Sequence, residues 1–253
     1  MPGGGATAQK SGEEPHDQTP LLADVPALPR SNGSRTRQLN EDRILRAAEA
    51  VFAEAGFNGT TMQAIAEAAK LPKANLHYYF GTKEGLYRAL LNRVLDGWVD
   101  AFDHFQPDRE PADAFTDYVR DKMRFTRQRP MASKVFANEI IHGAQHVSHY
   151  LKTKLRDRVD KKAAVIADWI RAGKMAPVDP HHLFFSLWAV TQTYADFDVQ
   201  VAAVLAKPRL GRGDLDDATN HILMLVLRTC GLSEAPPGAR PETRPETRIE
   251  HHT

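Results

Sequence analysis

The chain has 253 residues, of which 42% are hydrophobic and 26% are charged, and its formal net charge is +1. This length allows one large domain or two modest ones, and no run approaches the roughly 20 apolar residues of a membrane-spanning helix, which argues against a membrane protein. The single Cys230 excludes an internal disulfide, and no Cys/His spacing of the zinc type occurs, so we expect no metal. Since the N-terminus also lacks a charged segment followed by an apolar one, we expect a cytoplasmic protein.

Positive charge gathers after the first 29 residues. Residues 30–90 hold nine Arg or Lys against six Asp or Glu (9 − 6 = +3), whereas residues 1–29 hold one Lys against four acids (1 − 4 = −3). Residues 1–35 and 233–253 have no hydrophobic periodicity, so we predict that both are disordered tails. A DNA-binding segment in this chain would therefore begin near Arg30.

Between the tails, apolar residues recur at helical spacing and period-two alternation is nearly absent, which predicts an all-α fold of about nine helices. We expect an N-terminal domain of three helices over residues 36–84 and a C-terminal helical domain over residues 85–232. The first helix should cover residues 40–54 and end at Gly56, where a left-handed residue lets Phe57 pack back over the helix. Later helices are predicted over residues 83–105, 112–128, 130–142, 147–172, 180–206 and 214–230.

Two short helices follow the first one within the N-terminal domain. Thr60 and Gln63 have the spacing of a capping box, which predicts a helix that starts there and ends before Pro72. A second short helix is predicted over residues 73–79. Two short helices joined by a tight turn are typical of a helix-turn-helix, whose second helix enters the major groove of DNA.

The second short helix carries side chains suited to DNA. Leu76, Tyr79 and Phe80 recur at helical spacing and should face the core. The side chains left outside or at the margin are Lys73, Asn75, His77 and Tyr78. They offer a cation, an amide and two rings with donors to phosphates and base edges, although each one alone would also suit a solvated surface. Thr82 can cap the next helix and place Lys83 in its first turn, where the ammonium and free N–H groups can hold a phosphate.

Residues 180–205 are the most informative part of the C-terminal domain. Trp188, Gln192 and Asp196 follow one another at intervals of four, so they share one helical face among apolar residues. A buried amide or carboxylate without a partner costs about 1–3 kcal/mol. A planar ligand with N–H donors and C=O acceptors would satisfy both groups and stack on Trp188. Alternatively, Trp188 is a core residue and the polar pair bonds neighbouring helices or a dimer mate.

Catalytic machinery is not visible in the sequence. There is no Gly-rich phosphate loop and no recognisable Ser/His/Asp or Cys/His arrangement, so we expect neither an enzyme nor a cofactor. The apolar content of the last two predicted helices exceeds what one thin domain can bury, which favours a homodimer. The candidate dimer contacts are Leu223, Leu225, Val226 and Leu227.

Residues 44–90 contain "AEAVFAEAGFNGTTMQAIAEAAKLPKANLHYYFGTKEGLYRALL" and resemble the DNA-binding domain of the TetR family of bacterial transcription regulators. The resemblance implies a recognition helix over about 73–79. It also implies that the following residues lie at the DNA: Thr60, Thr61, Lys73, Asn75, His77, Tyr78 and Lys83. Pro72 stands where the family usually has a Ser or similar cap, and His77-Tyr78 inverts the commoner order, so the base preference need not transfer. The arm with Arg37 and Arg43 either touches an adjacent groove or backbone, or is a solvated linker.

The span from about Lys122 to Val201 contains "RPMASKVFANEIIHGA" and "WIRAGKMAPVDPHHLFFSLWAVTQTYADF", and it resembles the pyrimidine-sensing members of that family. The resemblance implies a homodimeric repressor that binds a palindromic operator in double-stranded DNA and is released by uracil, thymine or a close catabolite. The ligand residues that it implies are Trp98, Lys122, Glu139, Trp188, Gln192 and Asp196. Two alternatives stay open: an architectural DNA-binding protein of the same fold without a ligand, and an enzyme that acts on a small heterocycle.

Overall fold

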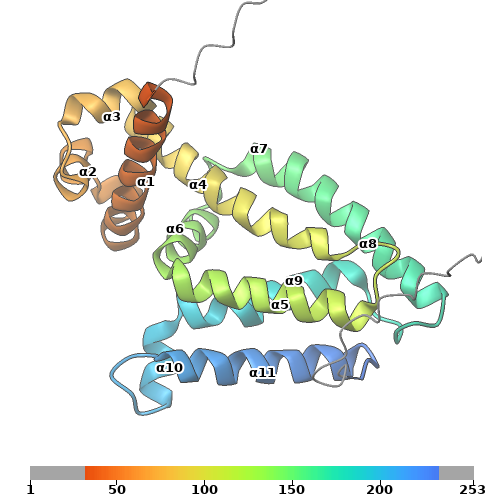
Figure 1. The fold of residues 1–253 in the computed structure, drawn as a ribbon. Helices are drawn as coiled ribbons and strands as arrows, with labels where there is room; N and C mark the ends of the chain where they lie inside the picture. The colour runs from red at the N-terminus through yellow and green to blue at the C-terminus, as the bar shows by residue number, and fades with distance from the viewer. Residues whose placement is uncertain (1–31, 234–253) are drawn as a thin grey trace, which may run out of the picture. The chain divides into compact units, whose positions relative to one another are not determined.

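The computed structural model describes residues 32–233, and every regular element in that range is helical, which confirms the predicted all-α fold (Figure 1). The chain divides into two units, residues 1–38 and 39–253, and the first contributes only the opening turns of α1 (Asn32–Gly59) to the described part. Residues 1–31 and 234–253 of the predicted tails lie outside the described residues. The predicted disorder of residues 32–35 is wrong, because they form the first turn of α1. Within the described range, no helix combines the length and apolarity needed to cross a bilayer.

Helix α1 extends beyond its predicted range at both ends and is interrupted at Gly56. Gly56 has φ 67° and ψ 177°, a backbone conformation that a residue with a Cβ rarely adopts. The interruption brings Phe57 back over the helix, where its ring centre lies 6.2 Å from that of Phe52 and 4.9 Å from that of Tyr87. The predicted closure at Gly56 is therefore present in the backbone and in the packing, and the helix resumes for the three residues after it.

The start of α2 (Met62–Ala69) corrects the predicted capping box. Thr61 is the N-cap, because its hydroxyl accepts the backbone N–H of Ala64 at 3.1 Å. Thr60 is only 2% exposed, and its hydroxyl donates to the carbonyl of Gly56 at 2.7 Å. The cap is thus shifted by one residue, because tertiary packing buries the first of the two threonines.

Helices α3 (Lys73–Phe80) and α4 (Lys83–Asp100) begin where the sequence predicts. Pro72 precedes α3 and supplies no side-chain cap, whereas the hydroxyl of Thr82 accepts the N–H of Gly85 at 3.0 Å and caps α4. The chain beyond α4 tightens into a 3-10 turn, η1 (Ala101–His104). Helices α1 to α4 share one core, whose most deeply buried members include Ile44, Phe52, Ile65, Leu76, Leu86 and Leu90.

The remaining helices form the C-terminal part of the fold. Their bounds are α5 (Pro111–Gln128), α6 (Pro130–Ile141), α7 (Ser148–Tyr150), the π-helical turn η2 (Leu151–Leu155), α8 (Arg156–Arg171), α9 (Pro180–Asp196), α10 (Asp198–Val204) and α11 (Arg212–Thr229). The single helix predicted over residues 180–206 is wrong. Phe197, with φ −119° and ψ 31°, leaves helical geometry, and the carboxylate of Asp198 accepts the N–H of Val199 at the start of α10.

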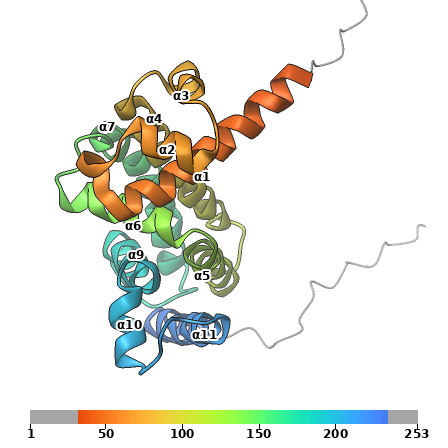
Figure 2. The ribbon, with the colours of Figure 1, turned by 90° about the vertical axis from the view of Figure 1, so that its left-hand side faces the viewer.

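Helix α5 lies against both α9 and α11 and anchors the C-terminal core (Figures 1 and 2). Phe105, Phe115, Tyr118 and Phe184 are fully buried in this core. Three of the four candidate dimer residues, Leu223, Val226 and Leu227, are also buried in it. Their prediction as dimer contacts is therefore wrong, because α11 turns that face toward its own chain. Only the fourth, Leu225, is exposed, at 44%.

Candidate functional site

The outer face of α3 presents the side chains that the sequence suggested for DNA. They are Lys73, Asn75, His77 and Tyr78. Leu76 is fully buried beneath them, while the side chain of Tyr78 is 73% exposed. Lys73 and His77 are exposed and Asn75 is half-buried. A short helix thus displays polar side chains from a fixed apolar base, and their contact with DNA stays a prediction.

Lys83 points into the protein as well as toward its surface. Its Nζ donates to the carbonyls of Phe57 at 2.9 Å and Thr60 at 3.0 Å, and it lies 4.4 Å from the centre of the Phe57 ring. These carbonyls lie at and just beyond the end of α1, where a helix leaves acceptors without partners and favours a cation. Two of the three N–H groups of the ammonium therefore fasten the end of α1 to the start of α4, which leaves one for the predicted phosphate contact.

The other predicted DNA contacts differ in exposure. The predicted DNA contact of the Thr60 side chain is wrong, because the hydroxyl is buried and donates to the carbonyl of Gly56. Thr61 is exposed at the start of α2. Arg43 is exposed too, and its Nη2 donates to the carbonyl of Lys70 at 3.2 Å, at the end of α2. Arg37 is exposed and belongs to the separate unit of residues 1–38.

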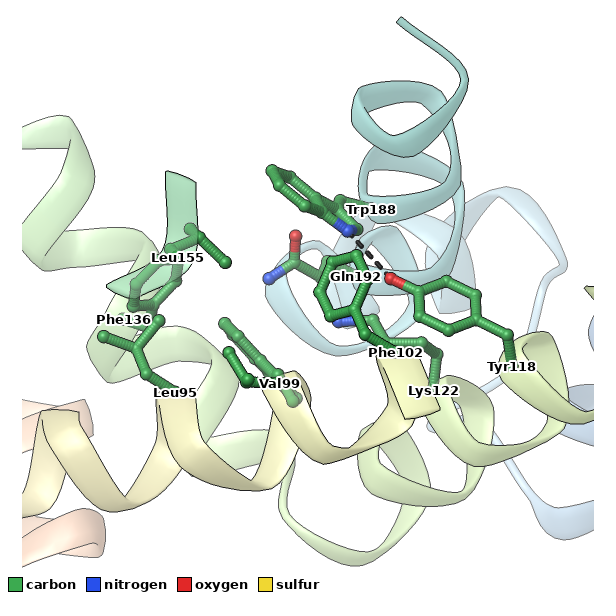
Figure 3. Close-up of a pocket in the computed structure, with 10 residues that line it drawn as sticks. Leu95, Val99, Phe102, Tyr118, Lys122, Phe136, Leu155, Trp188 and Gln192 are labelled. Atoms are coloured by element: carbon green, nitrogen blue, oxygen red, sulfur yellow. Dashed lines mark hydrogen bonds between the residues drawn. The ribbon is translucent and has the colours of Figure 1, made fainter. Parts of the chain in front are cut away.

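A cavity of about 40 Å³, partly open to solvent, lies among α4, η1, α5, α6, η2 and α9 (Figure 3). Its apolar wall is formed by Leu95, Trp98, Val99, Phe102, Phe136, Leu155 and Trp188. Three polar side chains complete the lining: Tyr118, Lys122 and Gln192. Four of the six predicted ligand residues, Trp98, Lys122, Trp188 and Gln192, are thus brought together from α4, α5 and α9. The mixture of aromatic walls and few polar groups is typical of small-molecule sites.

Tyr118 is a lining residue that the sequence reasoning missed. The indole Nε1 of Trp188 donates to its hydroxyl at 2.9 Å, which fixes the Trp188 ring at the cavity wall (Figure 3). Tyr118 is fully buried, and burial raises the pKa of its phenol, so the group stays neutral. The available signal was its position one helical turn before Lys122, which places both on one face of α5.

Lys122 is buried in the cavity wall at 4% exposure, and its Nζ lies 4.2 Å from the centre of the Trp98 ring. Among the described residues, its ammonium donates no hydrogen bond to a protein acceptor. Burial lowers its pKa to about 7, although the nearby charge of Asp196 opposes this shift. The cation–π contact therefore only partly replaces hydration, and a hydrogen-bond donor remains available at the cavity.

Asp196 lies beside the cavity and does not line it. Its Oδ1 is buried without a hydrogen-bond partner, and so is the Oγ of Ser133 on α6. Burial raises the pKa of Asp196, while Ser133 and the positive charge of Lys122 act in the opposite direction. The structure thus brings Asp196 into electrostatic reach of a cavity residue, and its direct contact with a ligand stays a prediction.

Glu139 lies away from the cavity, so its predicted place in the ligand site is wrong. Its carboxylate accepts the backbone N–H of His146 at 2.6 Å and lies 3.1 Å from Nδ1 of the same residue. The carboxylate also lies near Tyr87 on α4, and burial together with this negative charge raises the pKa of the Tyr87 phenol. Helix α6 turns Glu139 toward the loop before α7 and the start of α4, where both of its oxygens are used.

Two family descriptions match consecutive parts of the chain. "Bacterial regulatory proteins, tetR family" matches residues 44–90, and "YcdC-like protein, C-terminal region" matches residues 91–233. The HTH-type transcriptional regulator RutR of Escherichia coli K12 is 42% identical over 177 residues, which cover 69% of this chain and 84% of RutR. The HTH-type transcriptional repressor NicS of Pseudomonas putida is 28% identical over 148 residues, 57% of this chain and 69% of NicS.

Solved structures agree on the fold. The ketosteroid transcriptional regulator KstR2 of Mycobacterium tuberculosis superposes with a TM-score of 0.61 at 18% identity, over 75% of this chain and 94% of that one. The TetR-family regulator PfmR of Thermus thermophilus gives a TM-score of 0.57 at 22% identity, over 74% and 98%. Because the sequence identities are this low, these superpositions show a shared arrangement of helices and nothing more.

Proposed function

The chain belongs to the TetR family and is a RutR-like DNA-binding transcription regulator, and from this premise we propose that it is a repressor controlled by a pyrimidine base. Two copies would bind a palindromic operator through α3, and uracil or thymine in the cavity would release them. The regulated genes would serve pyrimidine and nitrogen metabolism. The observation that carries this proposal is the convergence of Tyr118, Lys122 and Gln192 on a cavity with aromatic walls.

The polar groups of the cavity suit the edge of a pyrimidine ring. Such a ring presents N–H donors next to C=O acceptors, and the side-chain amide of Gln192 offers one group of each kind. Lys122 supplies donors for a second carbonyl, and its ammonium is without a protein acceptor in the described structure. The rings of Trp98 and Trp188 offer apolar surface to the flat faces of the ligand. A neutral planar imide therefore fits this site better than a long aliphatic effector.

Helix α4 connects the cavity to residues 44–90, which we call the DNA-binding part. Lys83 and Trp98 are fifteen residues apart on it (98 − 83), which is about 22 Å along the helix axis. A change of tilt at the cavity end would move the end that Lys83 fastens to α1. Because the two recognition helices of a dimer must lie about one DNA turn apart, roughly 34 Å, a ligand that favours another spacing by ~1–3 kcal/mol would release the operator.

The buried side chains of α11 cannot form the proposed dimer interface, but other apolar side chains are exposed and support it. They lie on α9, α10 and α11 and comprise Phe185, Val199, Val204, Leu205 and Leu225, with exposures between 44% and 80%. A monomer gains nothing by presenting so many large apolar groups on neighbouring helices. A second copy would cover them.

The test combines a thermal shift with a gel shift on the DNA upstream of the protein's own gene. Uracil or thymine at 100 times its Kd should stabilise the protein by about 2.7 kcal/mol and release the DNA. Gln192→Ala should keep DNA affinity and lose release by the ligand. Ser186→Ala, on the exposed face of the same helix, is the matched control and should behave as the original protein.

Two results would contradict the proposal. If no pyrimidine changes the melting temperature or the gel shift, the chain binds DNA without this effector, as an architectural protein would. If Gln192→Ala is still released at the original ligand concentration, the ligand site lies elsewhere. Turnover of uracil by the purified protein would instead favour the enzyme alternative.

A further inference from the structure

Helix α6 begins without a cap from its own segment. Arg129, the residue before its first turn, forms no side-chain cap bond, and Pro130 has no N–H. The carboxylate of Glu49, from the middle of α1, takes this place. Its Oε1 accepts the N–H of Ala132 at 3.1 Å, while Oε2 accepts Nε of Arg129 at 3.2 Å and also its Nη2. A side chain of the DNA-binding part therefore caps a helix of the C-terminal part.

The contact between Glu49 and α6 is buried and is held by several hydrogen bonds. Glu49 is only 8% exposed, and the arginine binds its carboxylate through two nitrogens. Charge-assisted bonds of this kind are roughly twice as strong as neutral ones, and the partial positive charge of a helix N-terminus adds to them. Removal of the carboxylate would leave both the arginine and the N–H of Ala132 without a partner. Helix α1 is thus tied to the first turn of α6.

The middle of α6 faces the cavity. Phe136 lines it, and its ring meets that of Trp98 nearly edge-on with centres 4.8 Å apart. One turn later, Glu139 lies near Tyr87 on α4, and α6 packs against α4. Helix α6 therefore contacts α1 through its first turn, packs against α4, and lines the cavity in between.

We propose that Glu49 is a positioning residue through which occupancy of the cavity acts on α1. An occupant placed against Trp98 displaces Phe136 and with it the first turn of α6, and the carboxylate of Glu49 carries that displacement into α1. Since α1 and α3 share one core, and Asn40 of α1 donates to the hydroxyl of Tyr79 on α3 at 3.2 Å, the recognition helix moves with α1. This route through α6 and Glu49 acts in addition to the route through α4. It rests on the proposed function only for the identity of the molecule in the cavity.

The first part of the test measures how strongly uracil weakens DNA binding. Affinity for a duplex from the upstream region is measured with and without uracil, and uracil binding is followed separately by thermal shift. In Glu49→Ala, uracil should still bind, whereas the ratio of the two DNA affinities should fall on the order of tenfold. Glu49→Gln, which keeps an acceptor for Ala132, should lose less. A purely structural role would lower the melting temperature and both DNA affinities and leave their ratio unchanged, which would overturn the proposal.

The matched control is an ion pair of α6 that does not reach the DNA-binding part. Lys134 Nζ lies 2.7 Å from a carboxylate oxygen of Asp198 on α10. Asp198→Asn removes that pair and should leave the effect of uracil on DNA affinity as it is in the original protein. A loss as large as that of Glu49→Ala would make the effect a general one of α6 stability and would overturn the assignment.

A double-mutant cycle tests the route without any ligand. Phe136→Ala alters the cavity face of α6, and its effect on DNA affinity is measured in the original protein and in Glu49→Gln. We expect Phe136→Ala to change DNA affinity in the original protein and to have much less effect in Glu49→Gln. An equal effect in both, or none in either, overturns it. If uracil fails to bind the original protein while the cycle is non-additive, the proposed ligand is wrong and the role of Glu49 stands.

Discussion

Lys83→Met separates two roles of one side chain. The sequence predicts that Lys83 holds a phosphate, whereas the structure shows its ammonium bonded to the carbonyls of Phe57 and Thr60. Methionine keeps an apolar stem of similar length over the Phe57 ring and removes the two hydrogen bonds. If the internal role dominates, the substitution destabilises the DNA-binding part and weakens DNA binding indirectly.

The size of the effect follows from the two bonds. Each bond from a charged donor contributes about 1.5–3 kcal/mol when it is buried, and the half-buried position of Lys83 reduces this to about 1 kcal/mol. Loss of both should lower the free energy of unfolding by about 2 kcal/mol. For a domain of this size, that change lowers the melting temperature by roughly 4–8 °C.

The assay pairs thermal unfolding with a salt titration of DNA affinity. A lost phosphate contact reduces the slope of log K against log salt by about 0.9, whereas an indirect loss lowers affinity at every salt concentration and keeps the slope. Lys73→Met is the matched comparison, because Lys73 is exposed on α3. It should reduce the slope and leave the melting temperature unchanged. A stable Lys83→Met protein with a slope reduced by 0.9 would refute our reasoning and restore the phosphate role.

Three further predictions concern the other parts of the molecule. Asn75→Ala should cost about 1–3 kcal/mol at particular base pairs and little at others, measured by a competition assay over single-base operator variants. Burial lowers the pKa of Lys122 from 10.5 to about 7, so between these pH values the unfolded chain holds a proton that the folded chain lacks, and the free energy of unfolding should rise with pH. Urea unfolding at pH 7 and pH 9 should show a smaller rise in Lys122→Met than in the original protein. Equal rises would contradict the assignment. Val204→Asp should weaken the proposed dimer at least tenfold in sedimentation equilibrium, and an unchanged dimer would exclude α10 from the interface.

Local chemistry made the helix-turn-helix largely predictable. Pro72 and Thr82 punctuate short helices in ways that depend only on their neighbours in the chain, and α3 and α4 begin at those residues. The choice between Thr60 and Thr61 was different, because either hydroxyl suits an N-cap. The carbonyl of Gly56 and the burial of Thr60 decide it, and neither is visible in a pattern of residue types.

Contacts between distant segments account for most of what the sequence did not predict. Lys83 bonds carbonyls 23 and 26 residues earlier, and Glu49 caps a helix that starts more than 80 residues later. Neither pairing has a local signature. The shared face of Trp188 and Gln192 was predictable from helical spacing, whereas the misplaced Glu139 was carried over from family resemblance. Spacing on one helix therefore placed Trp188 and Gln192 in the cavity wall, whereas Asp196 and Glu139 lie outside its lining because their facing depends on how α9 and α6 pack.

Lys122 is the buried polar group of the cavity whose hydrogen bonds the proposed ligand would complete. Lys122 forms no hydrogen bond to the described protein. Asp196 Oδ1 and Ser133 Oγ, which lack a hydrogen bond of good geometry, lie next to each other outside the cavity lining. Each such group costs about 1–3 kcal/mol, and apolar side chains of similar size would avoid that cost. Under the proposed function, a pyrimidine carbonyl that accepts from the Lys122 ammonium would offset that cost.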